Sequence, residues 1–293
     1  TALMAATLAA CGSDGGNSGG SESKTSGEDT TAKKESGDDS KEIIYWNIGT
    51  ESPDKDVIAK AVDKFNSETE SGYTVTTVPT QNDTYKEKLV VAMSSGECPD
   101  MYSNWSGGPM YEYIDSGFGQ PIDDLFNASD IKDKLMDAAV SQATYNDHVY
   151  AVPYQNVSLA GIFYNKEMFE EAGITLATTW DEWMSNLETL KTSGVCSAPL
   201  SSMTGENCWT TNLILSSIIG TSGEEGNEFM NINGYIQDYD ESFVAEAYDM
   251  IRTMLKDYSL PDAIGSDYAT TANHFLNEET AIIANGPWMT PDF

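Results

Sequence analysis

Residues 42–48 read EIIYWNI, a run with the length and apolar composition of a buried β-strand. Ser52-Pro53 follows as the N-cap and first-turn proline of a helix. The apolar residues of that helix repeat at helical spacing before Gly72: Val57, Ile58, Ala61, Val62 and Phe65. Residues 73–78 have the composition of a second strand. This order of strand, helix and strand predicts an α/β fold with mostly parallel strands.

The same alternation continues along the rest of the chain. Asp83 is expected to cap a helix that ends near Gly96. Ala172-Gly173 predicts a helix end at which glycine takes the left-handed conformation, and Thr179 with Glu182 forms a capping box. The other predicted elements are strands at residues 101–103, 150–152 and 162–164, and helices at residues 111–114, 129–143, 210–219 and 240–256.

Length and charge narrow the classes of protein to consider. A chain of 293 residues, 40% hydrophobic, is long enough for two lobes with a sizeable core. Its 47 acidic and 15 basic residues give a formal charge of -32, which disfavours nucleic acid and anionic membrane surfaces as partners. The two histidines, His148 and His274, have no metal-ligand spacing around them, so we expect surface or loop histidines and no metal site.

The N-terminal segment has the pattern of an exported lipoprotein. Residues 1–10 are nearly all apolar or small, like the end of a signal peptide. Leu8-Ala9-Ala10-Cys11 resembles the bacterial lipobox, which predicts a lipid anchor on Cys11 at the outer face of the cell membrane, with palmitate among its acyl chains. The alternative is an ordinary secretory cleavage site that ends in cysteine. Residues 12–40 lack large apolar side chains and predict a disordered tether with a reach of roughly 30 Å.

Three further cysteines leave the disulfide pattern open. Export permits disulfides, and a bridge between Cys196 and Cys208 would close a short loop. With Cys98 present as well, three pairings are possible, and the sequence does not choose among them.

Motifs for catalysis are missing from the sequence. There is no G-x-S-x-G elbow, no phosphate-binding G-x-x-x-x-G-K, and no G-x-G-x-x-G between a strand and a helix. Carboxylate pairs such as Asp123-Asp124 arise by chance in so acidic a chain. Residues 231–234 read NING, which predicts a tight turn rather than a calcium loop. We therefore expect no enzyme activity and no cofactor.

Several segments, taken in order, carry a resemblance to a known family. They are SGECPD at residues 95–100, WSGG at 105–108, YAVPY at 150–154, YNK at 164–166, Phe169, Ala172-Gly173, TWDE at 179–182, Phe275, Ala281 and NGPW at 285–288. Over residues 41–288 their order and spacing resemble those of family 1 extracellular solute-binding proteins, which are like maltose-binding protein. The sequence departs from the family at residues 277–279, where NEE replaces a common Gly-Lys step; we expect this to alter only a surface turn.

The resemblance implies the two-lobed, type II periplasmic-binding-protein fold. Each lobe is then a mostly parallel sheet flanked by helices, with a hinge between the lobes. The implied divisions are a signal remnant and lipobox at residues 1–11, the tether at 12–40, an N-terminal lobe at 41–153, a first hinge crossing at 154–158, and a C-terminal lobe at 159–293. The family's return crossings are absent from this sequence, so the C-terminal lobe is expected to be incomplete.

The resemblance also supplies candidate ligand contacts. A sugar needs flat aromatic surfaces for its C–H faces and fixed polar groups for its hydroxyls. By family position these are Glu51, Trp105, Tyr154, Gln155, Asn156 and Trp288. Each has an alternative structural role: core or hinge packing for the aromatic residues, backbone hydrogen bonding for Gln155 and Asn156, and a place near a helix N-terminus for Glu51. Trp209 stays undecided.

The function implied is capture of a sugar or oligosaccharide and its delivery to the permease subunits of an ABC transporter, by a monomer anchored to the membrane through lipid. Three alternatives remain open at this stage: a binding protein for another small solute, such as a polyol or a glycerophosphodiester; a membrane-anchored carbohydrate-active enzyme; and a sensor that presents sugar to a membrane kinase.

Overall fold

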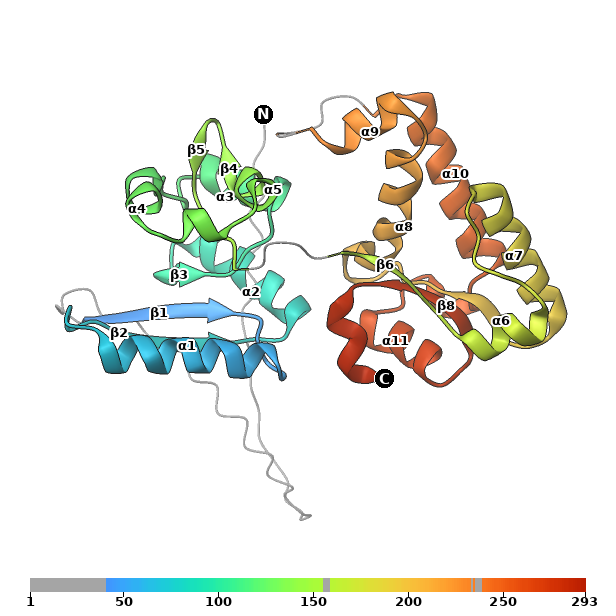
Figure 1. Ribbon diagram of the computed structural model, residues 1–293, viewed down its shortest axis with the longest axis horizontal. Helices are drawn as coiled ribbons and strands as arrows, with labels where there is room; N and C mark the ends of the chain where they lie inside the picture. The colour runs from blue at the N-terminus through green and yellow to red at the C-terminus, as the bar shows by residue number, and fades with distance from the viewer. Residues whose placement is uncertain (1–40, 155–158, 233, 235–238) are drawn as a thin grey trace, which may run out of the picture. The chain divides into compact units, whose positions relative to one another are not determined.

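A three-stranded parallel sheet begins the described part of the chain (Figure 1). The computed structural model describes residues 41–154, 159–232, 234 and 239–293. Strand β1 (Glu42–Asn47) lies between β2 (Thr74–Pro79) and β3 (Met101–Tyr102), and its register runs from Glu42 opposite Thr74 to Asn47 opposite Pro79. Helices α1 (Asp54–Glu68) and α2 (Asn82–Ser95) connect these strands, as the alternation predicts.

Helix boundaries in this first lobe correct two predictions. Helix α1 starts at Asp54 with Pro53 as its N-cap, one residue later than expected, and the Ser52 hydroxyl donates to the Asp56 carboxylate instead of capping. The side chain of Gln81, not Asp83, caps α2 by accepting hydrogen bonds from two backbone N–H groups. Gln81 has an extended backbone that aims its amide oxygen at the first turn, a role its residue type does not signal.

Small elements complete the first lobe. They are α3 (Gly108–Asp115), α4 (Asp123–Ala128), the 3₁₀ turn η1 (Lys132–Lys134), α5 (Asp137–Gln142) and the antiparallel pair β4 (Thr144–Tyr145) and β5 (His148–Val149). The helix predicted at 129–143 is thus broken into η1 and α5. The strand predicted at 150–152 is wrong, since pairing ends at Val149. Tyr85, Leu89 and Met93 of α2 form the buried core of this lobe.

A second sheet, of mixed direction, organises residues 159–293. Strand β8 (Thr280–Asn285) lies in its centre, antiparallel to β6 (Gly161–Tyr164) and parallel to β7 (Ala198–Ser201). Around it are α6 (Lys166–Ala172), α7 (Trp180–Ser193), the 3₁₀ turn η2 (Glu206–Cys208), α8 (Trp209–Gly220), α9 (Glu224–Met230), α10 (Ser242–Asp257), η3 (Pro261–Ala263), α11 (Tyr268–Leu276) and η4 (Pro287–Asp292). This second lobe is the more deeply packed of the two.

Local sequence signals fix several boundaries of the second lobe. Thr179 accepts a hydrogen bond from the Glu182 N–H at 3.2 Å, which confirms Thr179 as the cap, and the Glu182 carboxylate accepts the Thr178 N–H at 2.7 Å. Gly173 ends α6 with φ +70°, as predicted. Every residue of β8 is buried, and its side chains meet a core that includes Leu187, Ile214 and Met254. Among the described residues, none of the helices has both the length and the hydropathy required to cross a bilayer.

The structure contradicts the candidate disulfide. Cys98, Cys196 and Cys208 are all free thiols. The Cys196 thiol points toward the Leu190 carbonyl, and the Cys208 thiol donates to the Thr204 carbonyl at 3.0 Å. The first thiol follows the end of α7 and the second belongs to η2, so short sequence separation did not bring them together. Cys11 lies outside the described residues, as does part of the turn predicted at 231–234.

Candidate functional site

Three aromatic side chains gather where β7 and β8 end. Because these two strands are parallel, their carboxyl ends meet at one edge of the sheet. Trp209 follows β7 through η2, Trp288 follows β8, and Tyr268 begins α11. The ring centroid of Trp209 lies 5.1 Å from that of Tyr268 and 5.9 Å from that of Trp288. We call Trp209, Tyr268 and Trp288 the aromatic platform.

Trp288 combines exposure with a fixed position. Its side chain is 47% exposed, although it belongs to an element that follows a wholly buried strand. Its indole ring folds back over Gly286 so closely that a Cβ atom at that position would overlap the ring. Glycine in the NGPW segment therefore allows the indole to pack directly against the backbone. The result is an open aromatic face held on a rigid support.

Buried polar groups position the platform from below. Asn285 is fully buried; its amide donates to the Tyr268 hydroxyl at 3.2 Å, and its oxygen accepts from the Gly286 N–H at 2.9 Å. Burial raises the pKa of Tyr268, so this phenol stays protonated across the physiological range. One asparagine thus fixes both the tyrosine and the turn that carries Trp288.

An unusual turn leads into Trp209. Glu206, Asn207 and Cys208 have φ values of +47°, +58° and +57° in succession. L-residues visit this left-handed region mostly one at a time, and such strain gathers at functional sites. The Gly205 N–H donates to the Ser266 carbonyl at 2.9 Å, and the Glu206 carboxylate accepts the Tyr268 N–H at 2.8 Å. The turn is thereby bonded to the start of α11.

Two polar groups lie beside the aromatic platform. The Trp209 indole N–H is buried without a hydrogen-bond partner among the described residues. Burial raises the pKa of Glu206, whose Oε2 atom already accepts the Tyr268 N–H. The exposed Trp288 ring suits the C–H faces of a ligand, whereas the Trp209 N–H is shielded from solvent in this structure and would have to be uncovered to donate to a ligand hydroxyl.

The first lobe has its own group of polar and aromatic residues at the carboxyl ends of β1 and β3. Trp105 is half-buried and packs edge-on against Tyr85, with ring centroids 6.1 Å apart. The Lys86 ammonium lies 5.0 Å from the centre of the Trp105 ring. Trp105 thus packs against the core of this lobe and keeps only part of its surface for a ligand.

Asn47 was missed by sequence reasoning. It is the last residue of β1 and only 1% exposed; its oxygen accepts the Gly49 N–H, while its Nδ2 atom has no hydrogen-bond partner among the described residues. A buried unpaired amide costs free energy unless something else satisfies it. The sequence signal for Asn47 was a single polar residue inside the apolar run EIIYWNI. We interpreted that whole run as a strand.

The remaining candidates are more dispersed. Glu51 is exposed in the turn before α1, where its backbone carbonyl accepts the Lys55 N–H at 2.9 Å. Tyr154 is 62% exposed at the end of the first lobe. Gln155 and Asn156 lie outside the described residues. Of the six predicted contacts, Trp288 alone belongs to the platform; Trp209 and Tyr268 join it, although the sequence left the first undecided and the second unnoticed.

Metal ligands do not cluster in the part of the chain that the structure describes: no group of three His, Cys, Asp or Glu side chains there is arranged to hold an ion. His274 is a partly exposed histidine, as predicted, but it belongs to a helix and not to a loop. It lies in the last turn of α11, with carboxylates at both ring nitrogens.

Comparison with known proteins gives the family. The model of bacterial extracellular solute-binding proteins matches residues 49–292. The chain belongs to this family. It is a family of binding proteins, and its fold confirms the two-lobed α/β class predicted above.

Two curated relatives are named for the sugars that they bind. The chain is 29% identical to the xylose/arabinose-binding protein XacG of Haloferax volcanii, over 64% of this chain and 40% of that protein. It is 30% identical to the multiple sugar-binding protein of Streptococcus mutans, over 50% of this chain and 35% of that protein. The chain thus spans less than half the length of these two relatives.

Solved structures support the same fold. A chitin oligosaccharide binding protein superposes with a TM-score of 0.71 and 25% identity, covering 87% of this chain and 63% of that one. The raffinose complex of the binding protein RafE superposes with a TM-score of 0.62 and 21% identity, covering 86% of this chain and 64% of that one.

Proposed function

We propose that the protein captures a sugar or oligosaccharide outside a bacterial cell and delivers it to the permease subunits of an ABC transporter. The aromatic platform is the observation that carries this proposal. A sugar ring offers C–H groups on its faces and hydroxyls at its rim, and the platform offers an exposed indole beside an unpaired N–H and a carboxylate. The sugars named for the relatives give the proposal its ligand class.

The other candidate contacts enter the same proposal. Trp105, Glu51 and Tyr154, with Gln155 and Asn156, are the first-lobe and hinge residues that would meet the ligand when the lobes close on it. Asn47 joins them through its unpaired amide. In this proposal the protein acts as a monomer. It acts without catalysis, because transfer to a permease requires that the ligand leave unchanged.

Calorimetry tests the ligand class. The purified protein is titrated with xylose, arabinose, raffinose and chitin oligosaccharides, and we expect saturable binding of at least one. Trp288→Ala should weaken that binding about tenfold, which corresponds to roughly 1.4 kcal/mol. Tyr248→Ala is the matched control, because Tyr248 is an aromatic residue of α10 that is 52% exposed. The proposal fails if none of the sugars binds, or if both variants lose affinity equally.

We further propose that Cys11 carries the lipid anchor, that residues 12–40 form the tether, and that residues 41–153 and 159–293 are the two lobes. In a bacterial host, radiolabelled palmitate should enter the protein, and Cys11→Ser should abolish the label and move the protein from the membrane fraction to the medium. Cys98→Ser is the control, since Cys98 is a free thiol of the first lobe. Label retained by the Cys11 variant would contradict the anchor.

A further inference from the structure

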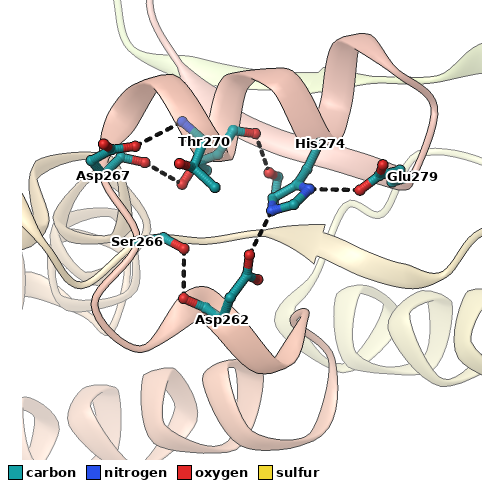
Figure 2. A network of polar contacts seen from close by, with 8 residues as sticks. Asp262, Ser266, Asp267, Thr270, His274 and Glu279 are labelled. Carbon is teal, nitrogen blue, oxygen red and sulfur yellow. Dashed lines mark hydrogen bonds and ion pairs between the residues drawn. The ribbon is translucent and has the colours of Figure 1, made fainter. Parts of the chain in front are cut away.

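His274 lies between two carboxylates at the end of α11 (Figure 2). Its Nδ1 atom is 2.6 Å from Oε2 of Glu279, and its Nε2 atom is 2.9 Å from Oδ2 of Asp262. The imidazole is partly enclosed, with 21% of its side chain exposed. Both ring nitrogens therefore face negatively charged acceptors at hydrogen-bonding distance.

This geometry selects one protonation state. A neutral imidazole has a single N–H, so one of its nitrogens would direct a lone pair at a carboxylate oxygen. The imidazolium ion donates from both nitrogens and makes two charge-assisted hydrogen bonds. Partial burial lowers the pKa of His274, but the hydrogen bonds to Glu279 and Asp262 outweigh it and raise this pKa above the usual 6.5.

The bridge joins three separate segments. Asp262 belongs to η3, His274 to α11, and Glu279 to the turn that enters β8. From these elements the charged groups that face the imidazole are the carboxylates of Asp262 and Glu279. Asp267, at the N-terminus of the same helix, is engaged with the N–H of Thr270 at 2.8 Å. The position of η3 against α11 thus depends on the charge of one imidazole.

The loop between η3 and α11 is also bonded to the turn that leads to Trp209. The Ser266 hydroxyl donates to the Asp262 carbonyl at 2.5 Å, and the Ser266 carbonyl accepts the Gly205 N–H. The Gly265 N–H donates to the Thr204 hydroxyl at 2.7 Å. Tyr268, which also belongs to the aromatic platform, is the first residue of α11 and follows this loop directly. A displacement of η3 would therefore reach both Trp209 and Tyr268.

We propose that His274 is a positioning residue that, as an imidazolium between Asp262 and Glu279, holds the aromatic platform in place and loosens it on losing its proton to solvent. The link from His274 to ligand binding rests on the proposed function. The geometry of the bridge and the test below do not require a sugar. Binding would then weaken as the surroundings become alkaline.

The direction of the pH effect follows from linkage. A histidine whose folded pKa is raised stabilises the fold fully below its unfolded pKa of about 6.5. That contribution is lost as the pH rises through the folded value. The bridge is therefore closed below the folded pKa of His274, as long as both carboxylates keep their charge, and it opens above that pKa.

Fluorine NMR can follow the platform without any ligand. The protein is labelled with 5-fluorotryptophan, the resonances of Trp209 and Trp288 are assigned with Trp209→Phe and Trp288→Phe, and spectra are recorded from pH 5 to pH 9.5. Titration of the His274 ring in a ¹⁵N-histidine sample gives its midpoint.

We expect the Trp209 resonance to shift with that same midpoint, and the shift to be lost in His274→Gln. His148→Gln is the matched control and should keep the shift, since His148 contacts Asp123 of the first lobe.

A second variant guards against failure of His274→Gln to fold. Asp262→Asn keeps the imidazole but removes one of its two charged partners, so the midpoint should fall by about one pH unit. The proposal is overturned if the Trp209 resonance does not respond to pH, if it responds equally in His274→Gln, or if the midpoint is unchanged in Asp262→Asn. Because no sugar is present, these outcomes stay separate from the calorimetric test.

Discussion

The two sheets of this protein arise from similar alternations of strand and helix, yet their central strands differ in burial. All residues of β8 are buried, whereas in β1 only Asn47 is. Helices α8 and α11 both contact β8, and the second lobe has an extended core around it. In the first lobe α1 packs on β2, and none of the residues of α1 is buried. Alternation along the sequence thus sets topology, while burial depends on what covers each face.

A substitution in each lobe tests this contrast and has the largest expected effect. Ile282→Ala removes a fully buried side chain from β8 and should lower the free energy of unfolding by about 2–5 kcal/mol. Val57→Ala changes a side chain of α1 that is 65% exposed, and it should alter the free energy of unfolding by less than about 0.5 kcal/mol. Chemical denaturation of both variants measures the difference. Similar losses would show that the two lobes are equally packed.

Sequence reasoning performed unevenly for this reason. The run EIIYWNI and the apolar spacing after Pro53 predicted β1 and α1 in the right places, but not that Val57 would be exposed. Helical periodicity indicates which residues share a face of the helix, but it does not indicate what packs against that face. Residue 282, by contrast, belongs to an apolar run for which burial on both sides is the usual outcome.

One residue of the candidate site was predictable from the sequence through a resemblance. NGPW predicted Trp288 by its likeness to a segment of the family, and the structure supplies a physical reason: Gly286 permits the close approach of the indole to the backbone. Trp209 and Tyr268 depend on the left-handed turn at residues 206–208 and on hydrogen bonds between distant loops. The residues in this turn are ordinary L-residues, so their residue types do not predict the left-handed conformation. The Cys196 to Cys208 bridge failed for a related reason, since proximity in sequence did not give proximity in space.

Two glycines of the second lobe differ in the space around them: Gly205 precedes η2, and Gly161 is the first residue of β6. A Cβ atom on Gly205 would lie 2.6 Å from the backbone oxygen of Ser266, whereas a Cβ on Gly161 would meet nothing within 4 Å. Gly205→Ala should therefore cost about 1–3 kcal/mol of stability through overpacking, and Gly161→Ala much less. Thermal unfolding of the two variants checks this. If Gly161→Ala is as costly, close approach of the two loops is not the cause.

The helix caps allow a comparison of smaller effects between the lobes. Thr179 caps α7 through the Glu182 N–H, and Thr179→Ala should destabilise the protein by about 1 kcal/mol. Gln81 caps α2 with distances of 3.0 and 3.4 Å, and its longer side chain loses more conformational freedom in doing so. Gln81→Ala should accordingly cost less than Thr179→Ala when both are measured by denaturant unfolding. A larger loss for Gln81→Ala would mean that its amide has a further role at the carboxyl end of β2.

The smallest effect concerns pH, where the two lobes should respond in opposite directions. In the first lobe, the Val149 N–H and the His148 ring both hydrogen-bond Asp123 and lower the pKa of its carboxyl. A carboxylate with a lowered folded pKa stabilises the fold above its unfolded pKa of about 3.9, and that contribution disappears as the pH falls through the folded value. Asp123→Asn should therefore destabilise slightly at pH 7 and have no effect at the lowest pH at which the protein still folds. His274→Gln in the second lobe should show the reverse, with its loss largest below pH 6.5 and absent in alkali. Unfolding curves of both variants, recorded across this pH range, distinguish the two contacts. If both variants lose stability with the same dependence on pH, the assignment of opposite signs is wrong.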